Sequence, residues 1–279
     1  MPSLELDVVL TPDLLHSSDT LEQSIALVID VFRATTTIAY ALHHQAKEVF
    51  TLPSLSAAEA KARELRSHLG DSMVVLCGER DGLKPEHFDL GNSPREYTVE
   101  HVCGKTIVLA TSNGTKAIER VSTAPLVLAA AFINLRSVAN FIVRYIVLNE
   151  ARYGDYHYTT TASIPTITTI TCVCAGSNKN FSYEDTLCAG ALVDTLQQEL
   201  ACNDYDITLS DAAVAAQHLY RAHRDNLSTV LHTTNHAQYL QRIGFGDDIL
   251  AAIAFNTCSI IPLRRTDGAF VHWHNPLNL

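Results

Sequence analysis

Short apolar runs alternate with helical patterns through the first half of the chain. Runs of five or six residues rich in Val, Ile and Leu are typical of buried strands, and the segments between them place apolar residues on one face of a helix. The predicted strands are 25–30, 48–52, 73–77, 106–110 and 126–130, and the predicted helices are 34–44, 56–68, 115–121 and 135–150. This alternation predicts an α/β fold, a layered α/β/α structure with a mostly parallel or mixed sheet.

The pattern changes after residue 150. The segment 151–164 is rich in Tyr and Thr and has no helical period, so we interpret it as a surface connection. It would separate two lobes, 1–150 and 165–279, although a single domain over 1–279 is an alternative. Outside the first-half pattern we predict strands at 1–10, 166–174, 258–262 and 269–273, a helix at 184–200, and mainly helix between 200 and 258.

Composition narrows the class of protein. The 279 residues are 47% hydrophobic and only 18% charged, which disfavours disorder and predicts a homo-oligomer, with a dimer favoured. A net charge of −10 without a Lys/Arg stripe disfavours nucleic-acid and membrane-surface binding. No apolar run reaches the roughly 18 residues of a membrane span. Seven scattered cysteines, with Cys77, Cys172 and Cys188 in apolar surroundings, favour reduced thiols in a cytoplasmic protein.

Four polar loops share one placement, because each follows directly on a predicted strand. They are 30–37 (DVFRATTT), 78–82 (GERDG), 111–115 (TSNGT) and 175–185 (AGSNKNFSYED). In an open α/β sheet the loops at the carboxyl ends of the strands line one crevice, where ligands bind. If the strands are parallel, the four loops therefore converge on one site.

The first loop combines a carboxylate with a candidate anion site. Asp30 closes an apolar run, and ionised carboxylates rarely lie deep in a core without a metal or a cationic partner. Arg33 follows, and then Thr35 and two more threonines open a helix, whose N-terminal N–H groups attract anions. The alternative is that the threonines only cap the helix.

The other three loops add donors and carboxylates. The turn formed by Ser112, Asn113, Gly114 and Thr115 is similar to a phosphate cradle, although Asn-Gly also marks ordinary turns. Glu79 and Arg80 lie at another strand end. Glu184 and Asp185 begin a helix after Ser182, where acidic residues are common and Ser182 could be the cap. Together with Asp30 and Glu79 they make a set of hard oxygen ligands suited to Mg²⁺.

These segments resemble the 2-phosphosulfolactate phosphatase family. The matching stretches are 28–42, 77–98, 110–118 and 175–193, with weaker similarity over 243–262. The resemblance implies a Mg²⁺-dependent hydrolase that converts 2-phosphosulfolactate to sulfolactate and phosphate, a product that feeds coenzyme M biosynthesis in methanogens. Two positions depart from the family pattern. Lys179 stands where glycine is frequent, and Asn256 stands where aspartate is common.

Phosphoryl transfer requires positioning and electrostatic stabilisation. We therefore predict Mg²⁺ on some of Asp30, Glu79, Glu184 and Asp185. The expected substrate-binding residues are Arg33 and Thr35, Arg80 for the substrate's carboxylate or sulfonate, and Ser112, Asn113, Gly114 and Thr115 for phosphate. Metal-bound water is favoured over Asp30 as the nucleophile. The alternatives are a non-catalytic binding protein for phosphorylated acids, a phosphatase for a different small acid, and a phosphotransferase.

Overall fold

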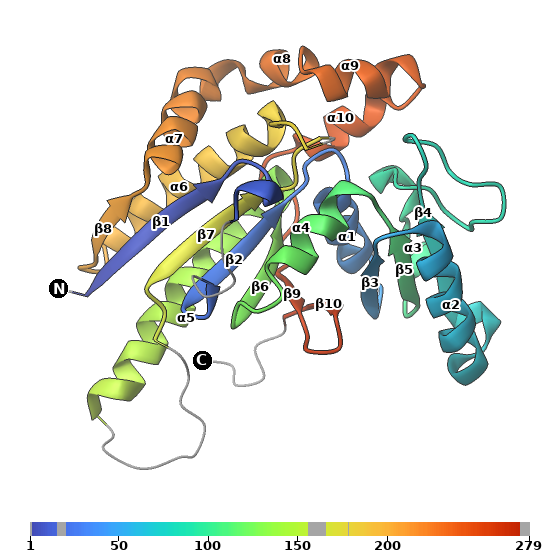
Figure 1. The fold of residues 1–279 in the computed structure, drawn as a ribbon, viewed down its shortest axis with the longest axis horizontal. Coiled ribbons are helices and arrows are strands. Elements are labelled where there is room, and N and C mark those ends of the chain that lie inside the picture. The colour runs from blue at the N-terminus through green and yellow to red at the C-terminus, as the bar shows by residue number, and fades with distance from the viewer. Residues whose placement is uncertain (1, 16–20, 156–165, 178, 274–279) are drawn as a thin grey trace.

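The computed structural model describes residues 2–15, 21–155, 166–177 and 179–273. Within these residues, ten strands form one mixed sheet in the order β4-β5-β3-β10-β9-β6-β2-β7-β1-β8, and helices cover it on both faces (Figure 1). The predicted α/β fold with a mostly parallel or mixed sheet is confirmed.

The sheet contains two blocks of parallel strands. The smaller block comprises β3 (Glu48–Leu52), β4 (Val74–Gly78) and β5 (Thr106–Ala110). The larger block comprises β1 (Ser3–Val9), β2 (Ser24–Ile29), β6 (Leu126–Ala130), β7 (Thr169–Cys174) and β8 (Asp206–Leu209). Strand β7 lies between β1 and β2, so segments from before residue 150 and after residue 165 share this block.

A hairpin of β9 (Pro262–Arg264) and β10 (Ala269–His272) joins the two blocks. Strand β10 is antiparallel to β3, and β9 is antiparallel to β6, where a single residue pair, Leu128 and Leu263, is in register. Adjacent strands rotate by roughly 20–25°, so twist accumulates over the steps from β5 to β2 and turns one block relative to the other.

The helices form layers on the two faces of the sheet. They are α1 (Ala34–His43), α2 (Leu55–Leu69), α3 (Val99–Val102), α4 (Asn113–Arg120), α5 (Leu135–Asp155), α6 (Tyr183–Ala201), α7 (Asp211–His223), α8 (Leu227–His232), α9 (Asn235–Arg242) and α10 (Gly246–Ala252). Figure 1 places α8 to α10 along the end of the sheet where β2 and β7 finish.

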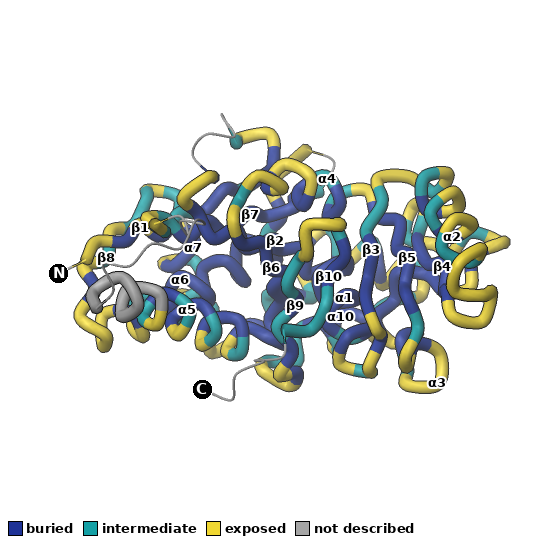
Figure 2. Tube along the Cα trace, turned by 90° about the horizontal axis from the view of Figure 1, so that it is seen from below, coloured by how far each residue is buried: buried dark blue, intermediate teal, exposed yellow. Residues whose placement is uncertain are grey.

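Strand β2 shows why the core is continuous. Ile25, Leu27 and Ile29 pack into the cluster that contains α5, α6 and α7, whereas Ala26 and Val28 pack into the cluster that contains α1 and α4. Helix α2 covers the opposite face of the smaller block. Because both faces are covered, the central strands consist mostly of apolar residues, and they are the buried part of the trace in Figure 2.

Most predicted elements are present, and three predictions are corrected. The last-but-one strand is 262–264 rather than 258–262, because Cys258 N–H donates to Ile133 and the amide of Asn134 donates to Ile260 instead of a strand partner. Strand β8 interrupts the stretch predicted as helix. Helix α5 continues through Asp155, and the remainder of the predicted connection, 156–164, lies outside the described residues.

Two further observations concern the thiols and the helices. All seven cysteines are free, and five of them are buried, including Cys77, Cys172 and Cys188. Burial raises the pKa of each of these three thiols. Within the part of the chain that the structure describes, no helix is long and apolar enough to cross a membrane.

The crossing of α6 and α7 depends on Gly190. A Cβ at this position would lie 2.0 Å from the carbonyl oxygen of Ala216 and 2.6 Å from its carbonyl carbon. Gly190→Ala should force the helices apart and lower the free energy of unfolding by about 3 kcal/mol. The matched control is Gly246→Ala, where the nearest atom to a new Cβ is 3.5 Å away in the Gln241 side chain. Urea unfolding measures both, and an equal effect of the two substitutions would contradict the packing argument.

Candidate active site

The loops that follow β2, β4, β5 and β7 meet at one place. Asp185, in the first turn of α6, accepts a hydrogen bond from Val31 N–H in the β2 loop at 2.8 Å. Arg33 donates from Nη2 to the carbonyl oxygen of Gly82 in the β4 loop at 2.7 Å. Gly114, after β5, lies against Asp30. The structure therefore brings the four loops together, although three antiparallel pairings, β3 with β10, β10 with β9 and β9 with β6, separate the two blocks.

Asp30 is buried at the end of β2, directly before α1. Its Oδ1 accepts a hydrogen bond from Ala34 N–H at 3.2 Å. Burial raises the pKa of the Asp30 carboxyl to about 6, because the charged form is poorly solvated. The neighbouring His236 opposes this rise, whereas the negative charges of Glu79 and Glu184 add to it. Asp30 thus belongs to a cluster of interacting acidic groups.

The threonines of the same loop have structural partners. The hydroxyl of Thr35 is fully buried and donates to the carbonyl oxygen of Asp30 at 2.9 Å. Thr36 donates to the carbonyl oxygen of Val31 at 2.9 Å, and Thr37 to that of Asn92 at 3.0 Å. These hydroxyls bond to carbonyl oxygens of the protein, and none of them caps α1, which has no side-chain cap at its N-terminus. The role of Thr35 in substrate binding stays a prediction.

The carboxylate of Asp185 accepts hydrogen bonds from two loops, the one after β2 and the one after β7. Oδ1 accepts from Val31 N–H, and Oδ2 accepts from Gly176 N–H in the loop after β7 at 3.2 Å. Burial, followed by the charge of Asp30, raises the pKa of Asp185 well above its usual range. Ser182 caps α6 by accepting from Asp185 N–H at 3.3 Å, as the capping alternative predicted.

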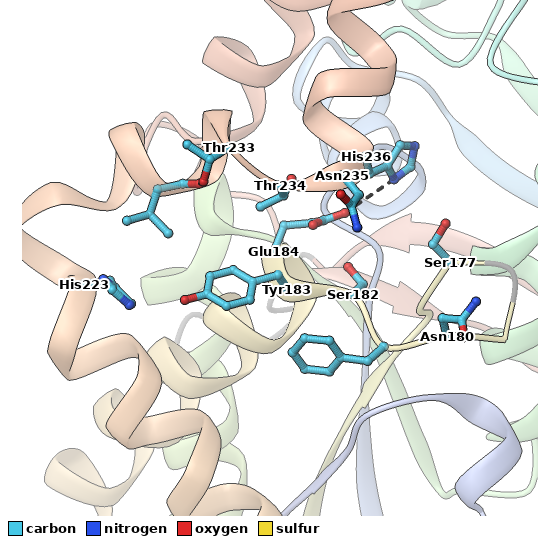
Figure 3. A pocket seen from close by; sticks show the side chains of 12 residues that line it. Ser177, Asn180, Ser182, Tyr183, Glu184, His223, Thr233, Thr234, Asn235 and His236 are labelled. Carbon is cyan, nitrogen blue, oxygen red and sulfur yellow. Dashed lines mark hydrogen bonds and ion pairs between the residues drawn. The ribbon is translucent and has the colours of Figure 1, made fainter.

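Glu184 faces a histidine that sequence reasoning missed. Its Oε1 lies 3.4 Å from Nδ1 of His236, in the first turn of α9, and the Glu184 side chain is buried (Figure 3). The ring of His236 also meets the ring of Phe32 edge-on, with centroids 6.2 Å apart. His236 belongs to no ligand-spacing motif, and only the fold brings α9 to the carboxylates.

The GERDG loop turns back on itself. Asp81 and Gly82 have φ of 53° and 74°, and the half-buried Glu79 accepts a hydrogen bond from Gly82 N–H at 2.7 Å. Tyr239 of α9 donates to the carbonyl oxygen of Asp81 at 2.7 Å. Arg80 is exposed at the edge of this loop. Glu79 therefore lies near Asp30 with one of its two oxygens bonded to its own loop.

Helix α4 approaches Asp30 because residue 114 is glycine. A Cβ at Gly114 would lie 2.8 Å from Oδ2 of Asp30 and 2.7 Å from Cβ of Ala34. Next along the helix, Thr115 is buried, and its hydroxyl lies 3.0 Å from that of Thr111 and donates to the carbonyl oxygen of Leu52 at 3.2 Å. Thr115 is thus occupied within the protein, whereas Ser112 is exposed and makes no side-chain cap.

Arg33 is buried in an ion pair. Its Nη1 lies 2.7 Å from Oδ2 of Asp248 in α10, and its guanidinium carbon lies 4.6 Å from the ring centroid of Phe245. Oδ1 of Asp248 accepts from the hydroxyl of Ser93 at 2.6 Å. The guanidinium predicted to bind phosphate is therefore held by protein groups. Sequence reasoning missed Asp248 and Ser93, although both lie in the stretches that carry the family resemblance.

The sequence also matches a known protein family over most of its length. A sequence model of the family described as 2-phosphosulpholactate phosphatase matches residues 9–267. The chain belongs to this family. The match includes all four loops of the site, α9 and α10.

Three curated relatives have the name "Probable 2-phosphosulfolactate phosphatase". The relative from Thermotoga petrophila is 37% identical over 266 residues, which cover 95% of this chain and 97% of the relative. The relative from Caldicellulosiruptor saccharolyticus is 35% identical over 233 residues, 84% and 86% of the two chains. The relative from Synechococcus sp. is 34% identical over 244 residues, 87% and 90%.

The acidic cluster does not form a complete metal site from protein groups alone. Among the described residues, no three His, Cys, Asp or Glu side chains are grouped so that they could hold a metal ion by themselves. Mg²⁺ in phosphate-processing sites is commonly bound by one or two carboxylates together with waters and substrate phosphate. The acidic cluster fits that mode of binding, and it does not fit a complete protein cage.

Removing the counter-charge of Arg33 should be costly. Asp248→Asn leaves a buried guanidinium without a carboxylate, and we expect a loss of about 3–5 kcal/mol in the free energy of unfolding. The matched control is the adjacent Asp247→Asn, which breaks an exposed ion pair with Arg95 of similar length, 2.8 Å, and should cost under about 1 kcal/mol. Urea unfolding measures the free energy of unfolding of both variants. A similar loss in the two would contradict a larger contribution of the buried Arg33 ion pair.

Proposed function

We propose that this protein is a Mg²⁺-dependent phosphatase that hydrolyses 2-phosphosulfolactate, or a similar small anionic phosphomonoester, to the alcohol and phosphate. The observation that carries the proposal is the position of Asp30, a buried carboxylate at the junction of four loops in a member of this family. Its neighbours are further carboxylates on one side and the start of α4 on the other.

We assign Mg²⁺ to Asp30 together with at least one of Glu79 and Glu184, with waters and substrate phosphate completing its coordination. Oδ1 of Asp30 and Oε2 of Glu79 accept backbone N–H groups, and Glu184 directs one oxygen to His236. Each carboxylate therefore has a second oxygen to offer. When bound, Mg²⁺ would polarise the phosphoryl group and offset the mutual repulsion of these acids. Asp185, with both oxygens on backbone N–H groups, supports the loops that present the ligands.

The chain's own groups would hold the remaining parts of the substrate. The first turn of α4 lies against Asp30, and the exposed Ser112 and half-buried Asn113 at its start would donate to phosphate oxygens. Arg80 is exposed at the rim, and its planar guanidinium suits the carboxylate or sulfonate. Arg33 holds the loops in place instead of touching substrate.

We favour water as the nucleophile over Asp30. Nucleophilic attack by an aspartate is usually assisted by an acid that protonates the leaving oxygen. The position two residues beyond Asp30 is Phe32, a buried aromatic side chain that cannot donate a proton. Asp30 would therefore keep its carboxylate as a ligand, and the oxygen of water would form the new bond to phosphorus as the ester oxygen leaves.

Asp30→Asn should abolish phosphate release while the protein stays folded. The change removes a charged ligand but retains an oxygen for Ala34 N–H. We expect kcat on 2-phosphosulfolactate with Mg²⁺ to fall at least a hundredfold, and EDTA to stop the wild-type reaction. Asp225→Asn, which changes a carboxylate that is 96% exposed, is the control and should leave kcat unchanged. If Asp30→Asn retained more than about a tenth of the wild-type kcat, the activation free energy would have risen by less than ~1.4 kcal/mol. That result would contradict the assignment.

The same substitution should stabilise the metal-free protein at high pH. The pKa of Asp30 is about 6 in the folded state and about 3.9 when unfolded. Stability from proton uptake is thus fully present below about pH 3.9 and is lost as the pH rises through about 6. The free energy of unfolding of Asp30→Asn, relative to that of the wild type, should therefore rise by about 2 kcal/mol between pH 4.5 and pH 8 in EDTA. Urea unfolding at both pH values tests this, and a gap independent of pH would argue against a strained carboxylate.

A further inference from the structure

A pocket of about 660 Å³ adjoins the acidic cluster (Figure 3). One wall is the loop after β7 with the first turn of α6, and the other is formed by the end of α7, α8 and the start of α9. Glu184 and His236 belong both to this pocket and to the surroundings of Asp30. These two side chains therefore connect the pocket with the acidic cluster.

The lining is polar but carries little charge. Among the described residues that form it, none is Lys or Arg, and Glu184 is the one carboxylate. Hydroxyl and amide groups come from Ser177, Asn180, Ser182, Thr233, Thr234 and Asn235. Two imidazoles, those of His223 and His236, complete the lining, and that of His236 already faces Glu184. A carboxylate or sulfonate placed here would meet the negative charge of Glu184 without a guanidinium or ammonium group in the lining.

The pocket also offers aromatic surface. Phe181 is 47% exposed, and its ring meets that of Tyr183 edge-on with centroids 6.2 Å apart. Exposed aromatic rings provide an apolar face, and the Tyr183 hydroxyl adds a polar end. Apolar ring faces beside several hydroxyl and amide groups match a ligand that has both C–H faces and hydroxyls.

Size points the same way. Pockets of roughly 300–1,000 Å³ hold ligands of the size of drugs or cofactors, well beyond a three-carbon acid. We propose that this pocket binds an uncharged, hydroxyl-bearing alcohol portion of about the size of a sugar, carried by a phosphomonoester whose phosphate lies beside Asp30. This inference rests on the proposed function and widens its substrate class. Hydrolysis would break the P–O bond, with water giving its hydroxyl to phosphorus and a proton to the sugar oxygen.

The test fills the pocket at its far end. Figure 3 shows Thr233 on the side of the pocket away from Ser177, and Thr233 is exposed at the end of α8. Thr233→Trp is compared with Thr229→Trp, an exposed threonine of the same helix that does not line the pocket. With Mg²⁺, glucose 6-phosphate and 2-phosphosulfolactate are supplied separately, and released phosphate gives kcat/KM.

We expect wild type and Thr229→Trp to hydrolyse both compounds. Thr233→Trp should lower kcat/KM for glucose 6-phosphate at least tenfold and change it less than threefold for 2-phosphosulfolactate. Hydrolysis of 2-phosphosulfolactate without any of glucose 6-phosphate would overturn the inference and leave the proposed function intact. An equal loss on both compounds in Thr233→Trp would overturn it too.

A binding measurement keeps the two proposals separable if neither compound is hydrolysed, an outcome that would reject the phosphatase function. Calorimetric titration with glucose 6-phosphate then tests the pocket by itself. The pocket assignment is supported if glucose 6-phosphate binds to wild type and to Thr229→Trp and binds at least tenfold more weakly to Thr233→Trp. No binding to wild type, or equal binding to all three proteins, overturns it.

Discussion

The buried guanidinium of Arg33 is the constraint on which the site depends. It joins the loop after β2 to Gly82 of the β4 loop and to Asp248 of α10, across two blocks of strands that pair through the β9–β10 hairpin. Burying two charges is expensive, so such a pair contributes geometry more than net stability. Because each partner is satisfied only when the loops are correctly placed, the pair selects the arrangement in which the carboxylates converge.

Once the loops are fixed, the acidic groups are crowded into a poorly solvated region. Asp30, Glu184 and Asp185 are all buried, and the pKa of Asp30 and that of Asp185 are raised chiefly by burial. Backbone N–H groups stabilise part of this charge, but a cation would stabilise it further. The arrangement is thus unfavourable for the metal-free fold, and under our proposal the binding of Mg²⁺ and phosphate would offset that cost, a common conflict between stability and function.

The sequence was sufficient where the signal is local. Apolar runs placed β3, β5 and β6 at their observed bounds, and the polar loops after strands identified Asp30 and its neighbours. The role of Arg33 was not predictable, because its partner Asp248 lies 215 positions away and nothing periodic links them. The contact of His236 with Glu184 was not predicted for the same reason, because the two residues are far apart in the sequence. Strand β9 lies at 262–264 instead of the predicted 258–262, because side-chain and backbone hydrogen bonds to the 132–134 turn occupy residues 258–260.

The central claim is that the four loops build one site for Mg²⁺ and phosphate. A crystal structure of the protein with Mg²⁺ and inorganic phosphate tests it most directly. The account predicts a metal ion bound by Asp30 and by at least one of Glu79 and Glu184, at oxygen distances of about 2.1 Å, with phosphate oxygens directed to the turn at 112–114. A metal ion bound away from all three carboxylates, or phosphate bound at a separate place, would contradict it.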